Sequence, residues 1–440
     1  MSPRLFHIPN DENLPPKADV VIIGGGIVGS SAAYFLARRG LSVALLEKGR
    51  VGCEQSSRNW GWCRQQNRDA RELPLSGVAL RLWDQISKDI GHDLGFRRTG
   101  LLYVTDKADQ LAQWEAWRQT ALPFGVNTRM LTRAEAVEVT RSAGRSWLGG
   151  VHSIDDGKAE PAQAAPLIAE GARALGTTIH QDCAARGLDV TNGAVTGVVT
   201  EKGLIQANAV LCAGGAWASA FCRAQGISFP QASVRQSVLR TQPAPNVGEA
   251  LYTPDCAITR RLDGSYLLAI SGKATFEVTP QGLRYARAFL PMFIKRLKAV
   301  EVGIGRSFLE GPGTLTGWRL DEVSPFEKIR VLDPSPRPST IAEALARTKA
   351  LFPELAGVEA VEAWGGYVDC TPDAVPVISP IEAIKGFYLA AGFSGHGFGI
   401  GPAAGHLAAD LVANDMPCVD PTPFRLSRLL DRSPVEVGAI

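Results

Sequence analysis

Residues 19–29 read DVVIIGGGIVG, and this stretch decides the fold of the 440-residue chain. The apolar run after Asp19 predicts a buried β-strand, the glycines a tight turn, and residues 27–39 a helix. A second apolar run ends at Glu47, about twenty residues beyond the glycines. A strand, a glycine turn, a helix and a second strand with an acid at its tip predict a Rossmann-like unit.

Each part of this unit has a physical role in binding a dinucleotide. Gly24 permits the turn, Gly26 lets the backbone approach a pyrophosphate, and Gly29 allows the helix to pack closely on the strand. The N–H groups at Ile27 and Val28 begin the helix and face the phosphates, while Glu47 accepts hydrogen bonds from a ribose. The motif therefore predicts an ADP-containing dinucleotide and leaves FAD and NAD open. A glycine turn of another α/β protein is the alternative.

The composition is that of a globular protein large enough for two domains, with 45% hydrophobic residues. The formal net charge is +2 and no long run of one sign occurs, so we expect no nucleic-acid partner. Residues 1–17 lack the basic and apolar regions of a secretory signal. No apolar stretch reaches the roughly 18 residues of a membrane-spanning helix. We therefore expect a cytoplasmic protein with no transmembrane segment.

The cysteines form neither a CxxC pair nor the Cys/His spacing of a zinc site. We therefore expect reduced thiols and no metal ion. The eight cysteines are Cys53, Cys63, Cys183, Cys212, Cys222, Cys256, Cys370 and Cys418.

Apolar patterns outline the rest of the chain. They predict helices at 80–90, 107–122, 161–175 and 403–412, and strands at 177–180, 194–200, 207–213 and 264–270. The four prolines of 324–339 predict a loop, and a capping box at 340–343 predicts a helix to residue 352. Basic and apolar residues alternate at 285–298, which indicates an ordinary surface helix or, alternatively, one on a membrane surface.

Four segments in order resemble the D-amino acid oxidase superfamily of FAD enzymes. The first is the Rossmann opening, and the second is SSRN at 56–59. The third is VLCAGGAW at 210–217, which ends in a glycine turn. The fourth is GFYLAAGFSGHGF at 386–398, preceded by TPDAVP at 371–376. This order makes FAD the expected dinucleotide, held by both ends of the chain.

The resemblance implies an α/β fold of two domains. A Rossmann-like FAD-binding domain would comprise 18–95, 150–230 and 360–425, and an α+β substrate domain with a mostly antiparallel sheet would comprise 96–149 and 231–359. The FAD would be noncovalent, because the cysteine that binds the flavin covalently in sarcosine oxidase falls near Gly365 or Gly366 in this chain. The further residues implied to bind FAD are Lys48, Ser56, Ser57, Arg58, Asn59, Ala184, Gly214, Trp217, Gly392, Phe393, Ser394, Gly395, His396, Gly397 and Phe398.

The resemblance also implies FAD-dependent oxidation of the C–N bond of a small amino acid. D-Amino acids are the first expectation; a secondary or N-methyl amino acid of sarcosine, proline or opine type is the rival. As a further alternative, the chain is the flavin-bearing subunit of a heteromeric dehydrogenase and works with a partner subunit. The electron acceptor is O2 or another molecule. Sarcosine oxidase carries a lysine where this chain has Gly399. Its oxygen-activating lysine would fall near Leu267 or Leu268, and Lys273 lies nearby but not at the matching place, which favours a dehydrogenase.

A substrate carboxylate requires a cation, ideally arginine. D-Amino acid and glycine oxidases carry an arginine for this purpose at a position that falls near Val368, and this chain has no arginine there. Arg64 is our first candidate, because it lies within one position of an arginine that binds the carboxylate in sarcosine oxidase. Arg319 is the second candidate, and Tyr367 caps the carboxylate or lines the pocket. The candidates for the apolar wall of the substrate pocket are Trp60, Trp62 and Trp364.

Overall fold

The computed structural model describes residues 3–140, 146–297, 300–431 and 435–438. One sheet has six strands in the order β20-β21-β12-β1-β2-β8, and all neighbours are parallel except β20 and β21. This sheet confirms the predicted Rossmann-like fold. Its strands are β1 (Val20–Ile23), β2 (Val43–Leu46), β8 (Thr178–His180), β12 (Ala209–Cys212), β20 (Val377–Pro380) and β21 (Phe387–Ala391).

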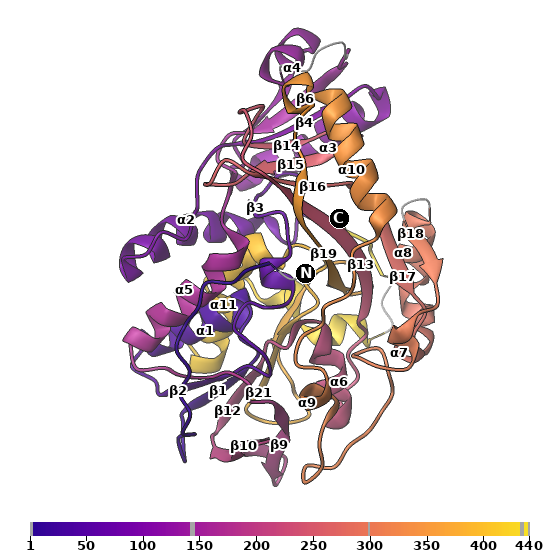
Figure 1. The fold of residues 1–440 in the computed structure, drawn as a ribbon. Helices are drawn as coiled ribbons and strands as arrows, with labels where there is room; N and C mark the ends of the chain where they lie inside the picture. The colour runs from indigo at the N-terminus through magenta and orange to yellow at the C-terminus, as the bar shows by residue number, and fades with distance from the viewer. Residues whose placement is uncertain (1–2, 141–145, 298–299, 432–434, 439–440) are drawn as a thin grey trace.

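Helices α1 (Ile27–Ala37), α5 (Pro161–Ala174) and α11 (Gly397–Ala413) pack together over this sheet (Figure 1). Their buried residues share one hydrophobic core. Helices α1 and α11 meet with almost no space between their backbones, because a Cβ at Gly405 would lie 2.8 Å from the carbonyl oxygen of Val28. The start of α11 is thereby fixed beside the start of α1.

The second sheet has ten strands in the order β18-β17-β13-β16-β15-β14-β4-β6-β5, with β19 also paired to β13. It is mostly antiparallel, as expected; β14–β4 and β17–β18 are its parallel pairs. Figure 1 shows the long strands β13 and β19 running from this sheet toward the first one. Its strands are β4 (Leu101–Thr105), β5 (Thr128–Leu131), β6 (Gly149–Ser153), β13 (Ala232–Thr241), β14 (Ala250–Tyr252), β15 (Ala257–Arg260), β16 (Tyr266–Ala269), β17 (Ala274–Glu277), β18 (Val300–Gly303) and β19 (Ala360–Cys370).

The other described elements lie outside these two sheets; β3 with β7, and β9 with β10 and β11, form two smaller sheets. The strands are β3 (Trp62–Cys63), β7 (Gly157–Lys158), β9 (Ala185–Thr191), β10 (Ala194–Thr200) and β11 (Gly203–Gln206). The α-helices are α2 (Leu73–Ile90), α3 (Ala108–Ala121), α4 (Arg133–Thr140), α6 (Ala218–Ala224), α7 (Pro280–Arg284), α8 (Ala286–Arg296), α9 (Pro325–Lys328) and α10 (Pro338–Leu351). The 3₁₀ helices are η1 (Gln55–Ser57), η2 (Leu122–Phe124), η3 (Gly215–Trp217), η4 (Arg306–Phe308), η5 (Pro353–Leu355), η6 (Thr422–Phe424) and η7 (Leu426–Leu429).

Two local predictions in the proline-rich region are wrong. The expected capping box at 340–343 does not form, because α10 already starts at Pro338, whose fixed φ suits the first turn of a helix. A capping box occurs instead between Ser324 and Glu327, where it starts the short helix α9 inside the expected loop.

Three further points concern expected segments. Strands β6 and β19 belong to the ten-stranded sheet, although they lie in ranges assigned to the FAD domain; the division into domains stays a prediction. Helix α8 occupies most of 285–298, and Lys298 lies outside the described residues. Among the described helices, none has the length and apolar character needed to cross a bilayer.

Candidate active site

A cavity of about 870 Å³ lies between the two sheets. The glycine turn after β1 and the turn before α11 line it, together with β13, β17 and β19 and with apolar side chains of α8. Its volume is that of a site for a large organic ligand. Segments from both ends of the chain therefore build one site, as the sequence predicted.

The glycine turn has the geometry that its sequence predicted. Gly24 has φ +107°, which permits the turn, and a Cβ at Gly29 would lie 1.9 Å from the carbonyl oxygen of Gly24. By contrast, the nearest atom to a Cβ at Gly26 would be Ser56 Oγ, 3.1 Å away. Gly26 therefore presents its backbone to the cavity, where a side chain would occupy the place of a ligand.

Glu47 lies buried at the carboxyl end of β2 and lines the cavity. Its Oε2 accepts from the N–H of Gly25 and its Oε1 from the N–H of Gly49, both at 2.8 Å. Burial raises the pKa of this carboxyl. The two backbone N–H groups fix the carboxyl beside the glycine turn, and its contact with the hydroxyls of a ribose stays a prediction.

The segment 56–59 is fixed against the glycine turn by its own polar groups. Ser56 Oγ accepts from the N–H of Ile27 at 2.9 Å and so caps the start of α1. Asn59 Nδ2 donates to the carbonyl of Ser56 at 2.8 Å. The buried guanidinium of Arg58 binds Asp333 at 2.7 Å and the carbonyl of Gly365 at 2.9 Å. This charge is therefore engaged with protein groups at the cavity wall.

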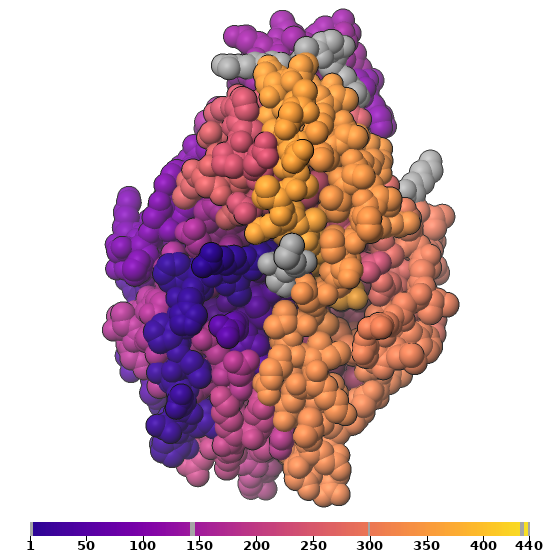
Figure 2. Space-filling model, in the orientation of Figure 1, coloured from indigo at the N-terminus to yellow at the C-terminus, as the bar shows by residue number. Residues whose placement is uncertain are grey.

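Lys48 was predicted to bind the cofactor, and its ammonium is engaged with protein groups. It donates to Glu54 at 2.6 Å and to the carbonyl of Arg330 at 2.7 Å, and it lies 4.9 Å from the Trp217 ring. Figure 2 shows the neighbouring segment around 310–340, in orange, over the lower part of this face. Lys48 thus ties that segment to the Rossmann-like unit.

Trp217 supplies a test of the predicted cofactor. Its Nε1 is buried and has no hydrogen-bond partner among the described residues, and the ring lines the cavity. An unpaired buried donor costs about 1–3 kcal/mol, which a ligand with acceptor oxygens removes. Together with Glu47 and the open face of Gly26, this donor fits an ADP-containing ligand.

The turn before α11 is fixed by a buried carboxylate that the sequence did not single out. Asp369 accepts from the N–H of Gly392 at 2.9 Å and from Gln231 Nε2 at 2.8 Å. The carbonyl oxygen of Asp369 also accepts from the N–H of Ser394, whose φ is +52°. Burial raises the pKa of the Asp369 carboxyl. The first turn of α11 therefore meets the cavity with its positive dipole end.

Most residues predicted to bind the cofactor line this cavity, and their contacts with FAD stay predictions. The lining includes Gly24, Gly26, Ile27, Val28, Glu47, Lys48, Ser56, Arg58, Asn59, Gly214, Trp217, Phe393, Ser394, Gly395, His396, Gly397 and Phe398. Gly29, Ser57, Ala184 and Gly392 are not among the lining residues. Ala184 is buried and its N–H donates to Glu201 Oε1 at 2.6 Å, so this group is already paired.

The three predicted substrate-binding residues lie in different places. Arg64 lines the cavity, 6.0 Å from the Tyr103 ring. Tyr367 also lines it; its hydroxyl donates to Glu277 at 3.4 Å, and burial raises its pKa to about 12. Arg319 lies outside the cavity, with its side chain 74% exposed and ion-paired to Asp321 at 3.0 Å. The position of Arg319 offers no contact with a ligand in this cavity.

Sequence reasoning missed two arginines that line the same cavity, Arg68 and Arg296. Arg68 lies in the irregular segment after β3, and Arg296 ends α8, so neither belongs to a motif that marks a ligand. Burial lowers the pKa of both guanidinium groups. The aromatic wall of the cavity contains Trp60 and Trp62, as predicted. Trp364 is instead buried in the core, where its Nε1 donates a hydrogen bond to the carbonyl of Arg58 at 3.2 Å.

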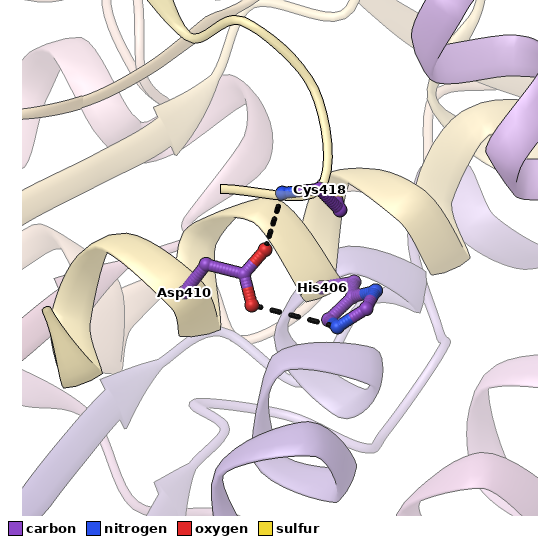
Figure 3. A group of neighbouring side chains, drawn as sticks. All are labelled: His406, Asp410 and Cys418. Carbon is purple, nitrogen blue, oxygen red and sulfur yellow. Dashed lines mark hydrogen bonds and ion pairs between the residues drawn. The ribbon is translucent and has the colours of Figure 1, made fainter. Parts of the chain in front are cut away.

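His406, Asp410 and Cys418 have potential ligand atoms within 4.8 Å of one another at the far end of α11 (Figure 3). Asp410 accepts from the N–H of Cys418 at 2.9 Å and lies 3.4 Å from His406 Nε2. The guanidinium of Arg39 also binds this carboxylate and so ties α1 to α11. Because Asp410 is paired with a cation, we assign no metal ion to this group.

Comparisons with known proteins agree with this geometry. Residues 19–411 match the family model described as DAO, FAD dependent oxidoreductase. The glycine oxidase of Geobacillus kaustophilus is 25% identical over 434 residues, which are 96% of this chain and 99% of that protein. Sarcosine oxidase subunit beta of an Arthrobacter species is 26% identical over 424 residues, which are 94% of this chain and 92% of that protein.

A solved structure extends the similarity over both sheets. It is L-amino acid deaminase from Proteus myxofaciens in complex with anthranilate, with a TM-score of 0.92 and 30% sequence identity. The match covers 97% of this chain and 97% of that protein.

Proposed function

Because the chain belongs to the DAO family of FAD-dependent oxidoreductases, we propose that its substrate is an L-amino acid with an apolar or aromatic side chain. The chain is an FAD-dependent enzyme that oxidises the C–N bond of an amino acid. The similarity to an L-amino acid deaminase at 30% identity and full coverage supports the L configuration over the D configuration first expected. Wild-type enzyme should convert L-phenylalanine, and not D-phenylalanine, to its 2-oxo acid. Conversion of the D enantiomer alone would contradict this.

The observation that carries the proposal is a pair of arginines among aromatic rings. Arg64, Arg296 and Tyr252 all line the cavity. Burial raises the pKa of Tyr252, and Arg296 and Arg64 both act on it in the opposite direction, so both cations lie near this ring. Tyr252 packs 4.7 Å from Tyr103 and 6.3 Å from Trp114. An amino acid matches this set, because its carboxylate pairs with guanidinium groups while its side chain contacts the rings.

The residues of this site bind and orient the substrate. Arg64 and Arg296 hold the carboxylate, and this fixes the α-carbon relative to the turn before α11. FAD supplies the chemistry of the step, acceptance of a hydride from the carbon next to the amine nitrogen. The product imine then hydrolyses to an oxo acid and ammonia, or to an oxo acid and an amine when the substrate nitrogen is substituted. The aromatic walls keep water away from the reacting carbon.

We expect all flavin to be released as free FAD when the purified holoenzyme is precipitated with trichloroacetic acid. Cys370 lines the cavity, but burial raises the pKa of its thiol to about 12, and an un-ionised thiol is a poor nucleophile. Absorbance of the supernatant measures the released flavin. Yellow colour that stays with the pellet would contradict noncovalent binding.

We propose that electrons leave to an acceptor other than O2. Lys273 is ion-paired to Glu343 at 2.5 Å and is not among the cavity-lining residues, and Gly399 carries no cation. Reduced enzyme mixed with air-saturated buffer should therefore reoxidise slowly, while an artificial dye acceptor restores the oxidised spectrum within a turnover. Stopped-flow absorbance measures both rates. Reoxidation by O2 as fast as flavin reduction would make the enzyme an oxidase.

A second candidate function is supported by the similarity to sarcosine oxidase subunit beta. In this proposal the substrate is an N-methyl amino acid and the chain works with a partner subunit. Isolated chain would then be reduced by sarcosine but would turn over slowly even with the dye. Full turnover of an L-amino acid by the isolated chain with the dye would exclude it.

A further inference from the structure

The imidazole of His396 is held by a buried carboxylate behind the turn before α11. His396 Nδ1 lies 3.0 Å and 3.2 Å from the two carboxyl oxygens of Glu72, and the two side chains are 2% and 0% exposed. Burial and then Arg68 lower the pKa of His396 to about 4, so its imidazole is neutral at pH 7. A neutral ring beside a carboxylate carries its proton on Nδ1, which donates to Glu72. Nε2 is then an acceptor.

Unpaired polar atoms surround this pair. His396 Nε2 is buried and, within the described ranges, has no hydrogen-bond partner. Arg68 is 2% exposed, and its Nε and Nη1 are likewise buried without a partner among the described residues. Burial and then Arg64 lower the pKa of Arg68 to about 9, so the guanidinium keeps its charge at pH 7. Glu72 acts on Arg68 in the opposite direction and raises its pKa.

We propose that Glu72 is a positioning residue that holds His396 as the Nδ1–H tautomer and offsets the charge of Arg68 beside the turn 392–398. The proposal rests on the assignment of this turn to the flavin side of the cavity, which both His396 and Arg68 line. Glu72 itself is fully buried in the segment just before α2 and is not among the lining residues. It therefore acts on the site through His396 and through its charge.

The charge balance has a direct consequence for the flavin. Reduction places negative charge on the flavin ring, so a positive potential at the turn stabilises the reduced state. Glu72 raises the pKa of Arg68, as do Tyr103 and Asp156, so its carboxylate offsets part of the positive charge of Arg68. Loss of the Glu72 carboxylate removes part of the charge that offsets Arg68, whereas loss of the Arg68 guanidinium removes the positive charge itself. The two changes must therefore shift the midpoint potential in opposite directions.

Burial is the main reason that the imidazole of His396 stays neutral over a wide pH range. Arg68 and Arg64 lower its pKa together with burial, while Glu72 raises it. Two further carboxylates lie nearby: Asp69 is ion-paired to Arg71 at 2.8 Å, and Asp156, which acts on Arg68, accepts from the N–H groups of Gln65 and Gln66. The folded-state pKa lies below the ordinary value of 6.5, so the neutral form is the one present from about pH 5 upward.

The first test is the tautomer of His396 in the wild-type holoenzyme, labelled with 15N at its six histidines. The His396 ring signals are identified by their loss in His396→Asn. We expect Nδ1–H and Nε2 without a proton, unchanged between pH 6 and 8. An Nε2–H tautomer, or titration in this range, would overturn the proposal. This measurement needs no substrate, so its failure is separate from failure of the proposed amino acid oxidation.

The second test compares midpoint potentials of the bound flavin, measured against redox dyes. We expect Glu72→Gln to favour the reduced flavin, and Arg68→Met to disfavour it, each by about threefold or more at a fixed potential. Asp84→Asn is the control, because Asp84 lies on α2, the helix that follows Glu72, but forms an exposed ion pair with Arg98. The proposal would be overturned if the midpoint potentials of both variants shifted in the same direction, or if neither potential shifted. If the Glu72→Gln protein does not bind FAD, the midpoint potential of Arg68→Met and the His396 tautomer of the wild type still test the proposal.

Discussion

Replacing Gly29 with valine is expected to give a protein that no longer binds FAD. The added Cβ would lie 1.9 Å from the carbonyl oxygen of Gly24, so α1 must move away from β1 or the turn must open. Either movement removes the backbone cradle at Gly26. The cost is on the order of 4 kcal/mol or more, because a backbone oxygen has no room to shift. Titration of the variant with FAD, followed by quenching of flavin fluorescence, measures the loss.

Gly40→Ala is the matched control for this variant. Gly40 follows the same helix and has φ +78°, but a Cβ there would meet no atom within 4 Å. This change introduces backbone strain of about 1–2 kcal/mol without a contact near the turn. It should lower the melting temperature slightly and leave FAD affinity unchanged. A Gly29→Val protein that binds FAD like the wild type would contradict the geometry of the turn.

The second large effect is expected at the proposed carboxylate clamp. Arg64→Met and Arg296→Met should each lower kcat/KM for an amino acid about 10–100-fold, because a hydrogen bond between charged groups contributes about 1.5–3 kcal/mol. The loss should appear mainly in KM, because the carboxylate is bound equally before and during the reaction. Steady-state kinetics with a dye acceptor measures it.

Two comparisons separate a clamp from general damage. The amine that lacks the carboxylate should be oxidised with the same low kcat/KM by the wild type and by both variants. Arg319→Met is the control, because Arg319 is exposed and paired to Asp321 outside the cavity. Its kinetics should equal those of the wild type. An unchanged KM for the amino acid in Arg64→Met and in Arg296→Met would refute the clamp.

The elements around the glycine turn were predictable because local sequence determines them. Gly24, Gly26 and Gly29 each have one conformational or steric reason to be glycine, and Glu47 follows from the strand that carries it. The start of α11 at Gly397 was less clear. The sequence suggested a helix only from residue 403, because glycine and Pro402 weaken the helical pattern. Packing against α1 stabilises the helix through this stretch.

The residues proposed to face the substrate were less predictable, because tertiary contacts bring them together. Arg296 comes from α8 and Arg64 from the segment after β3, and no sequence spacing relates them. Asp369 and Glu72 are single acids without a motif, and only burial beside Gly392 and His396 gives them a role. Arg319 has the residue type of a ligand but lies outside the cavity. Motifs therefore predict the dinucleotide-binding segments, whereas the proposed substrate-binding residues are brought together by the fold.

Anaerobic reduction of the bound FAD by amino acids tests the central claim most directly. Oxidised holoenzyme is mixed without oxygen with L-amino acids, their D enantiomers, and N-methyl amino acids, and the flavin absorbance is followed. We predict loss of the oxidised flavin band with aromatic or apolar L-amino acids, with one oxo acid formed per flavin. Reduction by D- or N-methyl amino acids alone would correct the substrate class. A flavin that no amino acid reduces would contradict the account.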